Sequence, residues 1–325
     1  MSIGDGANDV PMILEAHVGV GISGNEGMQA VRSADYAIAQ FAYLQPLMLV
    51  HGRDNYKRIS VVVMYSLYKN CFLVTSLFYY GVYSGFTATA LYDSLMLAGF
   101  NPGWSFVGII LFGIVEKDLS RGVALQNPEL YREGIENRDF NMGVLARWAL
   151  AGLLSTTFCF FIPTAIAVGK IASSTGQDDG LLPFGTNILQ ALVIAVNLRL
   201  LLETNNVTLW SLGSYAFGIV LFIFGSLLHS LWPLSSFFTK VPFEYYDVAM
   251  VLNKNGISWL IQLLVVVMVL IPDFIAKYVR RTYFPKAADI LRELDNGYGG
   301  GTEGGRTEGK GGIHANEDGK ALSAL

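Results

Sequence analysis

Charged residues are scarce in this sequence. Asp, Glu, Lys and Arg together make up 15% of its 325 residues, against about 25% in ordinary soluble domains. Apolar residues reach 52%, and 20 Phe, 16 Tyr and 5 Trp are among the chain's side chains. This composition predicts several helices that cross a membrane rather than one large soluble core. The net charge of -4 gives no indication of nucleic-acid binding.

Cysteines and targeting signals are scarce too. Cys71 and Cys159 both lie within apolar runs, which favours packing roles over a disulfide framework or a metal site. The first residues have neither the basic stretch nor the apolar stretch of a signal peptide. We therefore expect the chain to begin in the cytosol and its first apolar helix to direct membrane insertion.

Apolar stretches of transmembrane length recur from residue 59 onward. A helix needs about 20 residues to cross roughly 30 Å of hydrocarbon. Six stretches meet or approach that length: 59–83, 95–115, 144–168, 188–202, 212–231 and 257–275. The fourth is short, so we expect it to extend into its flanks.

Basic residues are distributed unevenly between alternate loops. With a cytosolic start, the inside loops hold Arg53, Lys57, Arg58, Lys117, Arg121, Arg132, Arg138, Lys277, Arg280, Arg281 and Lys286, whereas the outside loops hold Lys170, Lys240 and Lys254. Lys and Arg concentrate in cytoplasmic loops of membrane proteins. The asymmetry and the even number of spans predict a multi-pass protein with both termini in the cytosol.

The chain divides into three predicted regions. Residues 1–55 alternate short strands with helix-like stretches, which predicts a fragment of a Rossmann-like parallel α/β domain that needs further chain to cover its sheet. Residues 56–283 hold the six predicted transmembrane helices. Residues 284–325 form a cytosolic tail, with a short amphipathic helix at 284–294 and glycine-rich disorder from about residue 296.

A polar turn follows the first apolar stub. Asp5 and Asp9 stand four residues apart, after the expected strand and before the expected helix. Two carboxylates at the carboxyl end of a strand can present oxygen ligands to Mg²⁺ beside a phosphate. A GDG tripeptide is equally common as a purely structural turn.

Longer runs resemble a known family. GDGANDVPM at residues 4–12, VGVGISG at 18–24 and SADYAI at 33–38 are similar to the hinge region of the HAD-type phosphorylation domain of P-type ATPases. LVHGR at 49–53, YKN at 68–70, NPELY at 127–131, VNL at 196–198, PDF at 272–274 and RTYFP at 281–285 resemble the phospholipid-translocating (flippase) class. The resemblance extends to about residue 294.

That resemblance implies an ATP-driven pump that moves phospholipid between the leaflets of a plasma membrane or endomembrane. It implies that Asp5 helps to hold a catalytic Mg²⁺ and that Asn8 and Asp9 order the phosphate pocket. ATP is bound by regions that this chain lacks. The implied partners are phospholipid, the membrane, the remainder of the pump polypeptide and the accessory β-subunit of flippases.

The DKTGT motif, which carries the family's phosphorylated aspartate, does not occur in the sequence. Nor do the nucleotide-binding domain and the first four spans. We expect the chain alone not to hydrolyse ATP. Two interpretations stay open: the C-terminal portion of a pump, or a truncated membrane protein that binds a full-length pump or its accessory subunit without turnover. A phosphatase fused to a membrane anchor fails for want of a nucleophile.

Carboxylates are not expected at mid-membrane. Asp93, Glu116 and Glu203 lie at predicted span ends, whereas a cation pump needs oxygen ligands at membrane depth. The predicted substrate path is lined instead by Lys69, Asn70, Asn101 and Ser105, with Lys69 attracting the lipid headgroup. The structural alternative for Lys69 is a bond to a neighbouring helix or snorkelling.

Two further expectations concern buried polar and irregular positions. Arg199 precedes Glu203 by four residues, so we expect these two to pair. In flippases an Asn in the second of these spans is followed seven residues later by Pro. Here Gly108 takes that place while Pro102 directly follows Asn101, so we expect the helix kink about two turns earlier.

Overall fold

The computed structural model describes residues 1–24, 28–167, 180–231 and 245–299, without the side chains of 296–299. The chain forms two compact units. The smaller unit contains Met1–Tyr56, Leu119–Glu136 and the chain from Ile290, and the larger unit contains Lys57–Asp118 and Asn137–Asp289. Most of the predicted disordered tail lies outside the described residues. Helix α15 (Ala287–Gly299) extends slightly beyond residue 296, where the sequence predicts the disorder to begin.

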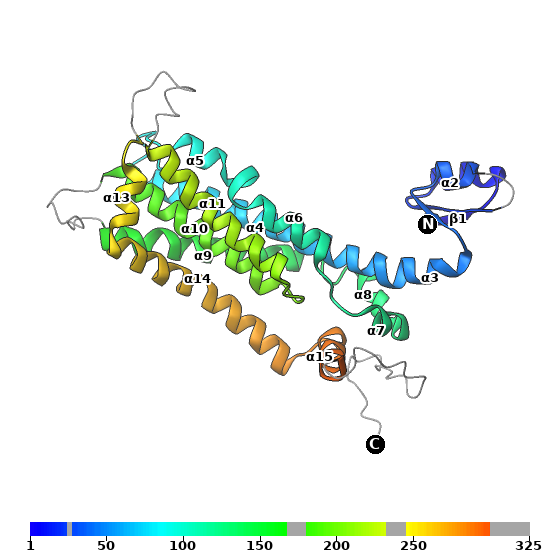
Figure 1. The fold of residues 1–325 in the computed structure, drawn as a ribbon. Helices are drawn as coiled ribbons and strands as arrows, with labels where there is room; N and C mark the ends of the chain where they lie inside the picture. Colours follow the sequence, from blue (N-terminus) through cyan, green and yellow to red (C-terminus); the bar gives the residue numbers. More distant parts are fainter. Residues whose placement is uncertain (25–27, 168–179, 232–244, 300–325) are drawn as a thin grey trace. The chain divides into compact units, whose positions relative to one another are not determined.

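The smaller unit holds a three-stranded sheet near the N-terminus (Figure 1). Strands β1 (Ser2–Gly4), β2 (Gly19–Ile22) and β3 (Tyr36–Ile38) pair in parallel in that order. Helices α1 (Val10–Glu15) and α2 (Gln29–Ser33) connect them. Ile13, Val20 and Ala30 are almost fully buried between these layers. The predicted parallel alternation is confirmed, and the wider Rossmann-like assignment stays a prediction.

The rest of the smaller unit is made of short helices. They are η2 (Phe41–Tyr43), α3 (Leu44–Pro46), η3 (Leu47–Gly52), α7 (Arg121–Gln126), η5 (Pro128–Tyr131) and α8 (Arg132–Ile135). Arg53 and Glu133 are both buried and pair at 3.5 Å between nitrogen and oxygen. This pair joins two segments of the unit that are far apart in sequence.

Helices of transmembrane length dominate the larger unit (Figure 1). Within the described residues, 5 helices have the length and hydropathy to cross a membrane. They correspond to α4 (Arg53–Tyr83), α9 (Met142–Ala167), α10 (Leu181–Glu203), α11 (Leu209–Leu231) and α14 (Gly256–Tyr283). The short helix α13 (Val248–Lys254) precedes α14. The fourth predicted span does extend into its flanks, as α10.

The second predicted span is broken. It consists of α5 (Ser94–Ala98), the π-helical segment η4 (Phe100–Trp104) and α6 (Phe106–Val115). Pro102 has no N–H to donate within a helix, whereas α6 continues undisturbed through Gly108. The expected position of the interruption is thus confirmed. Because this stretch is not one continuous span-length helix, the count of six spans stays a prediction.

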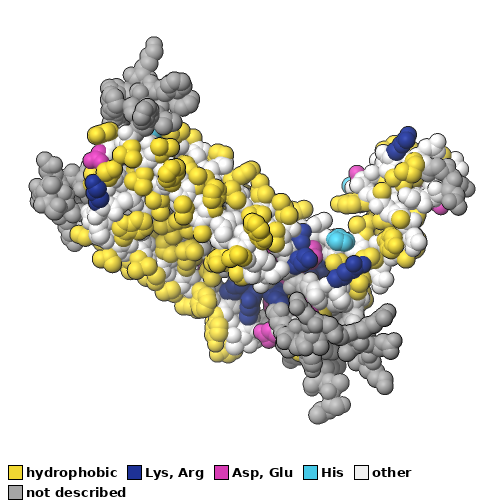
Figure 2. Space-filling view, in the orientation of Figure 1, with side chains coloured by type: hydrophobic (Ala, Val, Ile, Leu, Met, Phe, Trp, Pro, Cys, Tyr) yellow, Lys and Arg dark blue, Asp and Glu magenta, His cyan; other side chains and the backbone are white. Residues whose placement is uncertain are grey.

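Burial differs strongly between the long helices. Most of α10 is inaccessible to solvent, including Ile188, Leu192 and Val196. In contrast, α14 exposes Leu260, Leu263, Leu264, Val267, Met268 and Ile271. Hydrophobic side chains accordingly cover much of the visible surface of the helices in Figure 2. Exposed apolar helix faces of this extent suit a hydrocarbon surrounding.

Arg199 corrects one expectation from sequence. Its guanidinium pairs with Asp273 of α14 rather than with Glu203. The Oε2 atom of Glu203 instead lies 3.9 Å from the Nζ atom of Lys277. The Arg199 Cζ atom also lies 4.4 Å from the ring centroid of Tyr68 and 4.8 Å from that of Trp148. A local spacing of four residues could not compete with these partners, because α14, α4 and α9 converge on the buried face of α10 that carries Arg199.

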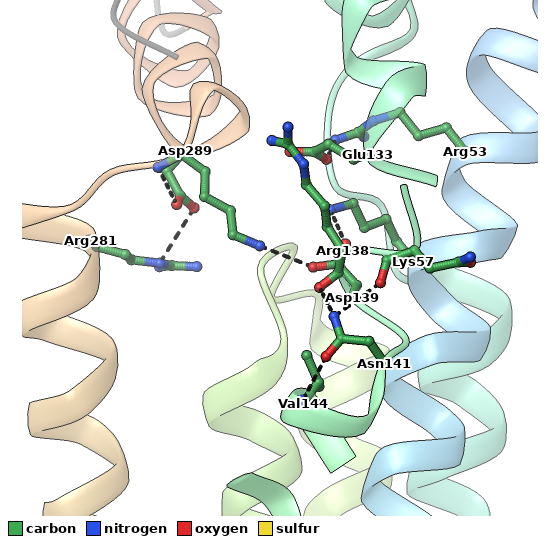
Figure 3. A network of polar contacts seen from close by, with 11 residues as sticks. Arg53, Lys57, Glu133, Arg138, Asp139, Asn141, Val144, Arg281 and Asp289 are labelled. Carbon is green, nitrogen blue, oxygen red and sulfur yellow. Dashed lines mark hydrogen bonds and ion pairs between the residues drawn. The ribbon is translucent and has the colours of Figure 1, made fainter. Parts of the chain in front are cut away.

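A second ionic cluster lies where α9 begins (Figure 3). Asp139 pairs with Lys57 and lies 3.0 Å from the Nζ atom of Lys286. Partial burial alone would raise the pKa of Asp139, but these two ammonium groups outweigh it and hold the pKa below its usual range. Asn141 Oδ1 accepts the Val144 amide at 2.9 Å, so the same loop caps the first turn of α9.

We expect Arg199→Leu to destabilise the protein by about 3 kcal/mol, because the half-buried carboxylate of Asp273 would lose the partner of its charge. Thermal unfolding in detergent measures the effect. The double variant Arg199→Leu/Asp273→Leu should recover much of the loss. Arg132→Leu, which removes an exposed pair with Glu136, is the control and should cost less than about 1 kcal/mol. Equal losses in single and double variants would contradict this assignment.

Candidate functional site

The predicted phosphate turn is closed by Asp9. Strand β1 ends at Gly4, and the turn η1 (Ala7–Asp9) leads into α1. Asp9 Oδ2 accepts the backbone amides of Asp5 at 3.1 Å and Gly6 at 3.3 Å. A Cβ atom at Gly4 would lie 2.3 Å from the Asp9 Cβ. Glycine at this position is therefore what lets the carboxylate fold back over the turn.

Asp5 and Asn8 are both exposed at the carboxyl end of β1. Gly24, just after β2, lies beside Asp5: a Cβ atom built on it would be 3.4 Å from that of Asp5. An exposed carboxylate is a suitable ligand for Mg²⁺. The part of the chain that the structure describes contains no group of three or more His, Cys, Asp or Glu side chains placed to hold a metal. Asp5 is thus the exposed carboxylate at this end of the sheet, without a metal-binding cluster of such side chains around it among the described residues.

Lys69 lies on α4 and faces the broken helix. Its side chain is buried, and its Nζ atom donates to Ser105 Oγ at 2.9 Å. The Ser105 hydroxyl in turn donates to the Phe100 carbonyl at 2.8 Å. The Lys69 Nζ atom also lies 5.9 Å from the Phe100 ring centroid. Across the described residues, Lys69 forms no ion pair, so a hydroxyl and a ring are what this ammonium meets.

Asn70 and Asn101 form a second link between α4 and the broken helix. Asn101 Nδ2 donates to Asn70 Oδ1 at 3.3 Å, and both side chains are exposed. The four residues predicted to line a substrate path therefore lie together as two neighbouring pairs. One pair is buried and carries the charge, whereas the other lies at the surface of the helices.

Two contributors near these pairs were not predicted as site residues. The Trp104 indole donates to the Met96 carbonyl at 2.9 Å, and Asn197 Nδ2 donates to the Trp104 carbonyl at 3.2 Å. In the sequence Asn197 is a polar residue within an apolar run and part of the VNL motif at 196–198, and neither feature indicates its partner. Its partner is a backbone atom, which leaves no signal in side-chain spacing.

Comparison with known proteins places this sequence in a family. Residues 31–286 match the family model described as phospholipid-translocating P-type ATPase C-terminal. The chain is 36% identical over 299 residues to phospholipid-transporting ATPase IH of Homo sapiens, covering 90% of this chain and 26% of that protein. It is 33% identical over 294 residues to phospholipid-transporting ATPase C887.12 of Schizosaccharomyces pombe, covering 90% of this chain and 23% of that protein.

A third relative agrees with these two. Phospholipid-transporting ATPase IC of Homo sapiens is 35% identical over 304 residues, which cover 90% of this chain and 23% of that protein. The chain thus spans about a quarter of the length of the curated relatives it matches. It belongs to the family of phospholipid-translocating P-type ATPases and corresponds to their C-terminal membrane portion.

Proposed function

We propose that this chain works as the C-terminal membrane portion of an ATP-driven pump that moves phospholipid between membrane leaflets. The remainder of the pump would supply the phosphorylated aspartate and the nucleotide site. The observation that carries this proposal is Lys69, an ammonium buried in an apolar bundle with a serine hydroxyl as its hydrogen-bond partner.

An ammonium at membrane depth costs about 2.5–3.5 kcal/mol on insertion scales. A single neutral hydroxyl offsets little of that cost. The phosphate or carboxylate of a lipid headgroup would neutralise the charge while it is bound, and its departure would restore the Ser105 bond. Asn70 and Asn101, exposed beside this pair, offer further donors and acceptors to a headgroup at the helix surface.

Cation transport is the competing chemistry, and the half-buried Asp273 carboxylate of α14 does not favour it. Asp273 is engaged by Arg199, so it already has a permanent countercharge. Asp93 and Glu116 flank the broken helix rather than lying within it. The polar groups that line the path are amides, a hydroxyl and an ammonium, which suit an anionic headgroup better than a metal ion.

At the other functional centre we assign Asp5 to Mg²⁺ and Asn8 and Asp9 to the order of the phosphate pocket. When bound with ATP, the metal would neutralise charge on the phosphoryl group in transfer. Asp9 Oδ2 already accepts two amides of the turn, which supports a role in holding the turn. A metal contact through its other oxygen stays part of the proposal.

The proposed setting is a plasma membrane or endomembrane with both termini in the cytosol. Six membrane crossings, with the broken helix as the second, would place the α4–α5 loop outside. The proposed partners are the rest of the pump and the flippase accessory subunit.

Thr87→Cys tests this orientation, because Thr87 is exposed in the α4–α5 loop. We expect a membrane-impermeant thiol reagent to label it from outside intact cells, in a background where Cys71 and Cys159 are replaced. Ser120 is also exposed, but it lies in a loop expected on the cytosolic side. Ser120→Cys should therefore react only after the membrane is opened. The reverse labelling pattern would overturn the orientation.

Asp5→Asn should lower phosphoenzyme formation in a complete pump by about 100-fold or more, because one anionic ligand of a hard cation is lost. Radiolabelled phosphate incorporation from ATP measures it. Asp9→Asn keeps an acceptor for the turn amides and should be milder. Wild-type phosphorylation in Asp5→Asn would remove the metal assignment.

Lys69→Ala should raise the phospholipid concentration for half-maximal dephosphorylation by about tenfold, the equivalent of about 1.4 kcal/mol. Phosphorylation from ATP should stay close to wild type. An unchanged lipid response would give Lys69 a structural role only. A complete wild-type pump that forms no phosphoenzyme would favour the alternative, a non-catalytic membrane partner.

A further inference from the structure

The break in the second apolar stretch is held by three side-chain hydrogen bonds to backbone carbonyls. Trp104 Nε1 donates to Met96, Ser105 Oγ to Phe100, and Asn197 Nδ2 to Trp104. Two of these donors belong to the broken segment itself. Asn197 is different, because it reaches the break from α10, a continuous helix.

Such bonds are needed because hydrocarbon offers no water to satisfy a freed carbonyl. Pro102 removes one N–H from the segment. Within η4, the amides of Gly103 and Trp104 both donate to the Gly99 carbonyl, at 2.9 and 3.0 Å. Irregular backbone of this kind persists in an apolar setting only where neighbouring groups re-satisfy it.

The surroundings of Asn197 are shaped for this contact. Its side chain is 1% exposed, and Nδ2 also donates to the Val193 carbonyl at 2.9 Å, so both amide hydrogens are used. A Cβ atom on Gly218 of α11 would lie 2.6 Å from the Trp104 carbonyl oxygen and 3.0 Å from Asn197 Oδ1. One on Gly108 of α6 would lie 3.5 Å from the same Oδ1. Gly218 therefore leaves room for the bond, whereas the distance at Gly108 is that of an ordinary contact.

Gln190 provides an internal contrast. It precedes Asn197 by seven residues on α10, which places it on the same helix face two turns away. It is 0% exposed, yet neither its Nε2 nor its Oε1 atom has a hydrogen-bond partner in the described part of the chain. Of these two buried amides on one face of α10, Asn197 bonds to the broken helix and Gln190 does not.

We propose that Asn197 is a positioning residue for the substrate path. From the rigid core helix it anchors the carbonyl end of η4, and so sets where Ser105 and Asn101 meet Lys69 and Asn70. Trp104 is the immediate neighbour of Ser105. A shift of about 1 Å at this carbonyl would stretch the 2.9 Å bond between Lys69 and Ser105 beyond hydrogen-bonding range. The effect on transport rests on the proposed function, whereas the anchoring itself does not.

The anchoring can be measured on the 325-residue chain in lipid nanodiscs. A spin label at Gly103→Cys reports on η4, because a Cβ atom there has nothing within 4 Å; Cys71 and Cys159 are replaced in the background. We expect Asn197→Leu, which keeps the size but removes the donor, to increase label mobility clearly. Gln190→Leu, the matched control, should leave the spectrum unchanged.

Gly218→Ala reaches the same bond by another route, since its new methyl group would press on the Trp104 carbonyl. It should mobilise the label as Asn197→Leu does. If Asn197→Leu leaves the label as immobile as Gln190→Leu does, the anchoring is wrong. If all three variants mobilise it alike, Asn197 has no special role and the proposal is likewise overturned.

In a complete pump, Asn197→Leu should raise the half-saturating phospholipid concentration by about tenfold, as expected for the loss of one buried hydrogen bond. Phosphoenzyme formation from ATP should persist, which also shows that the variant folds. Combined with Lys69→Ala, it should add little, because both act on the same contact. An unchanged lipid response in Asn197→Leu, beside a lipid-stimulated wild type, overturns the positioning role. A wild type without lipid stimulation refutes the proposed function and leaves the spin-label result to decide the anchoring.

Discussion

The larger unit depends on the neutralisation of one guanidinium away from water. Arg199 lies on the most buried helix, pairs with Asp273 of α14 and lies against the rings of Tyr68 and Trp148. These contacts join α10 to α14, α4 and α9. A buried charge is tolerated only when its partners are held in place, so the four helices are constrained in rotation as well as in distance.

Lys69 is also a buried cation, but unlike Arg199 it is not paired with a carboxylate among the described residues. Arg199 has a carboxylate and two aromatic faces, whereas Lys69 has a hydroxyl and the more distant Phe100 ring. The arginine is neutralised within the fold and gains nothing from a ligand. In the part of the chain that the structure describes, the lysine has no carboxylate partner, and this difference between the two buried cations separates a structural site from a candidate substrate site.

Helix α10 links the two sites. Asn197 and Arg199 are two residues apart, so their side chains leave the helix about 200° apart. One face is fixed by the ion pair, and the other holds the Trp104 carbonyl at the break. A helix buried on nearly all sides can serve as a fixed reference for a neighbour whose own backbone is interrupted. Rigid support from one element and irregular backbone in another together define the geometry around Lys69.

The sequence by itself determined the membrane class, the location of the long apolar helices, the parallel alternation at the N-terminus and the interruption at Pro102. These follow from local composition, periodicity and the missing proline N–H. The tertiary structure alone decided that Arg199 pairs with Asp273 rather than Glu203, and that Asn197 bonds to the Trp104 carbonyl rather than to a side chain. Such partners depend on helix rotation and on backbone atoms freed by a break, and neither is encoded in the spacing of residues along one helix.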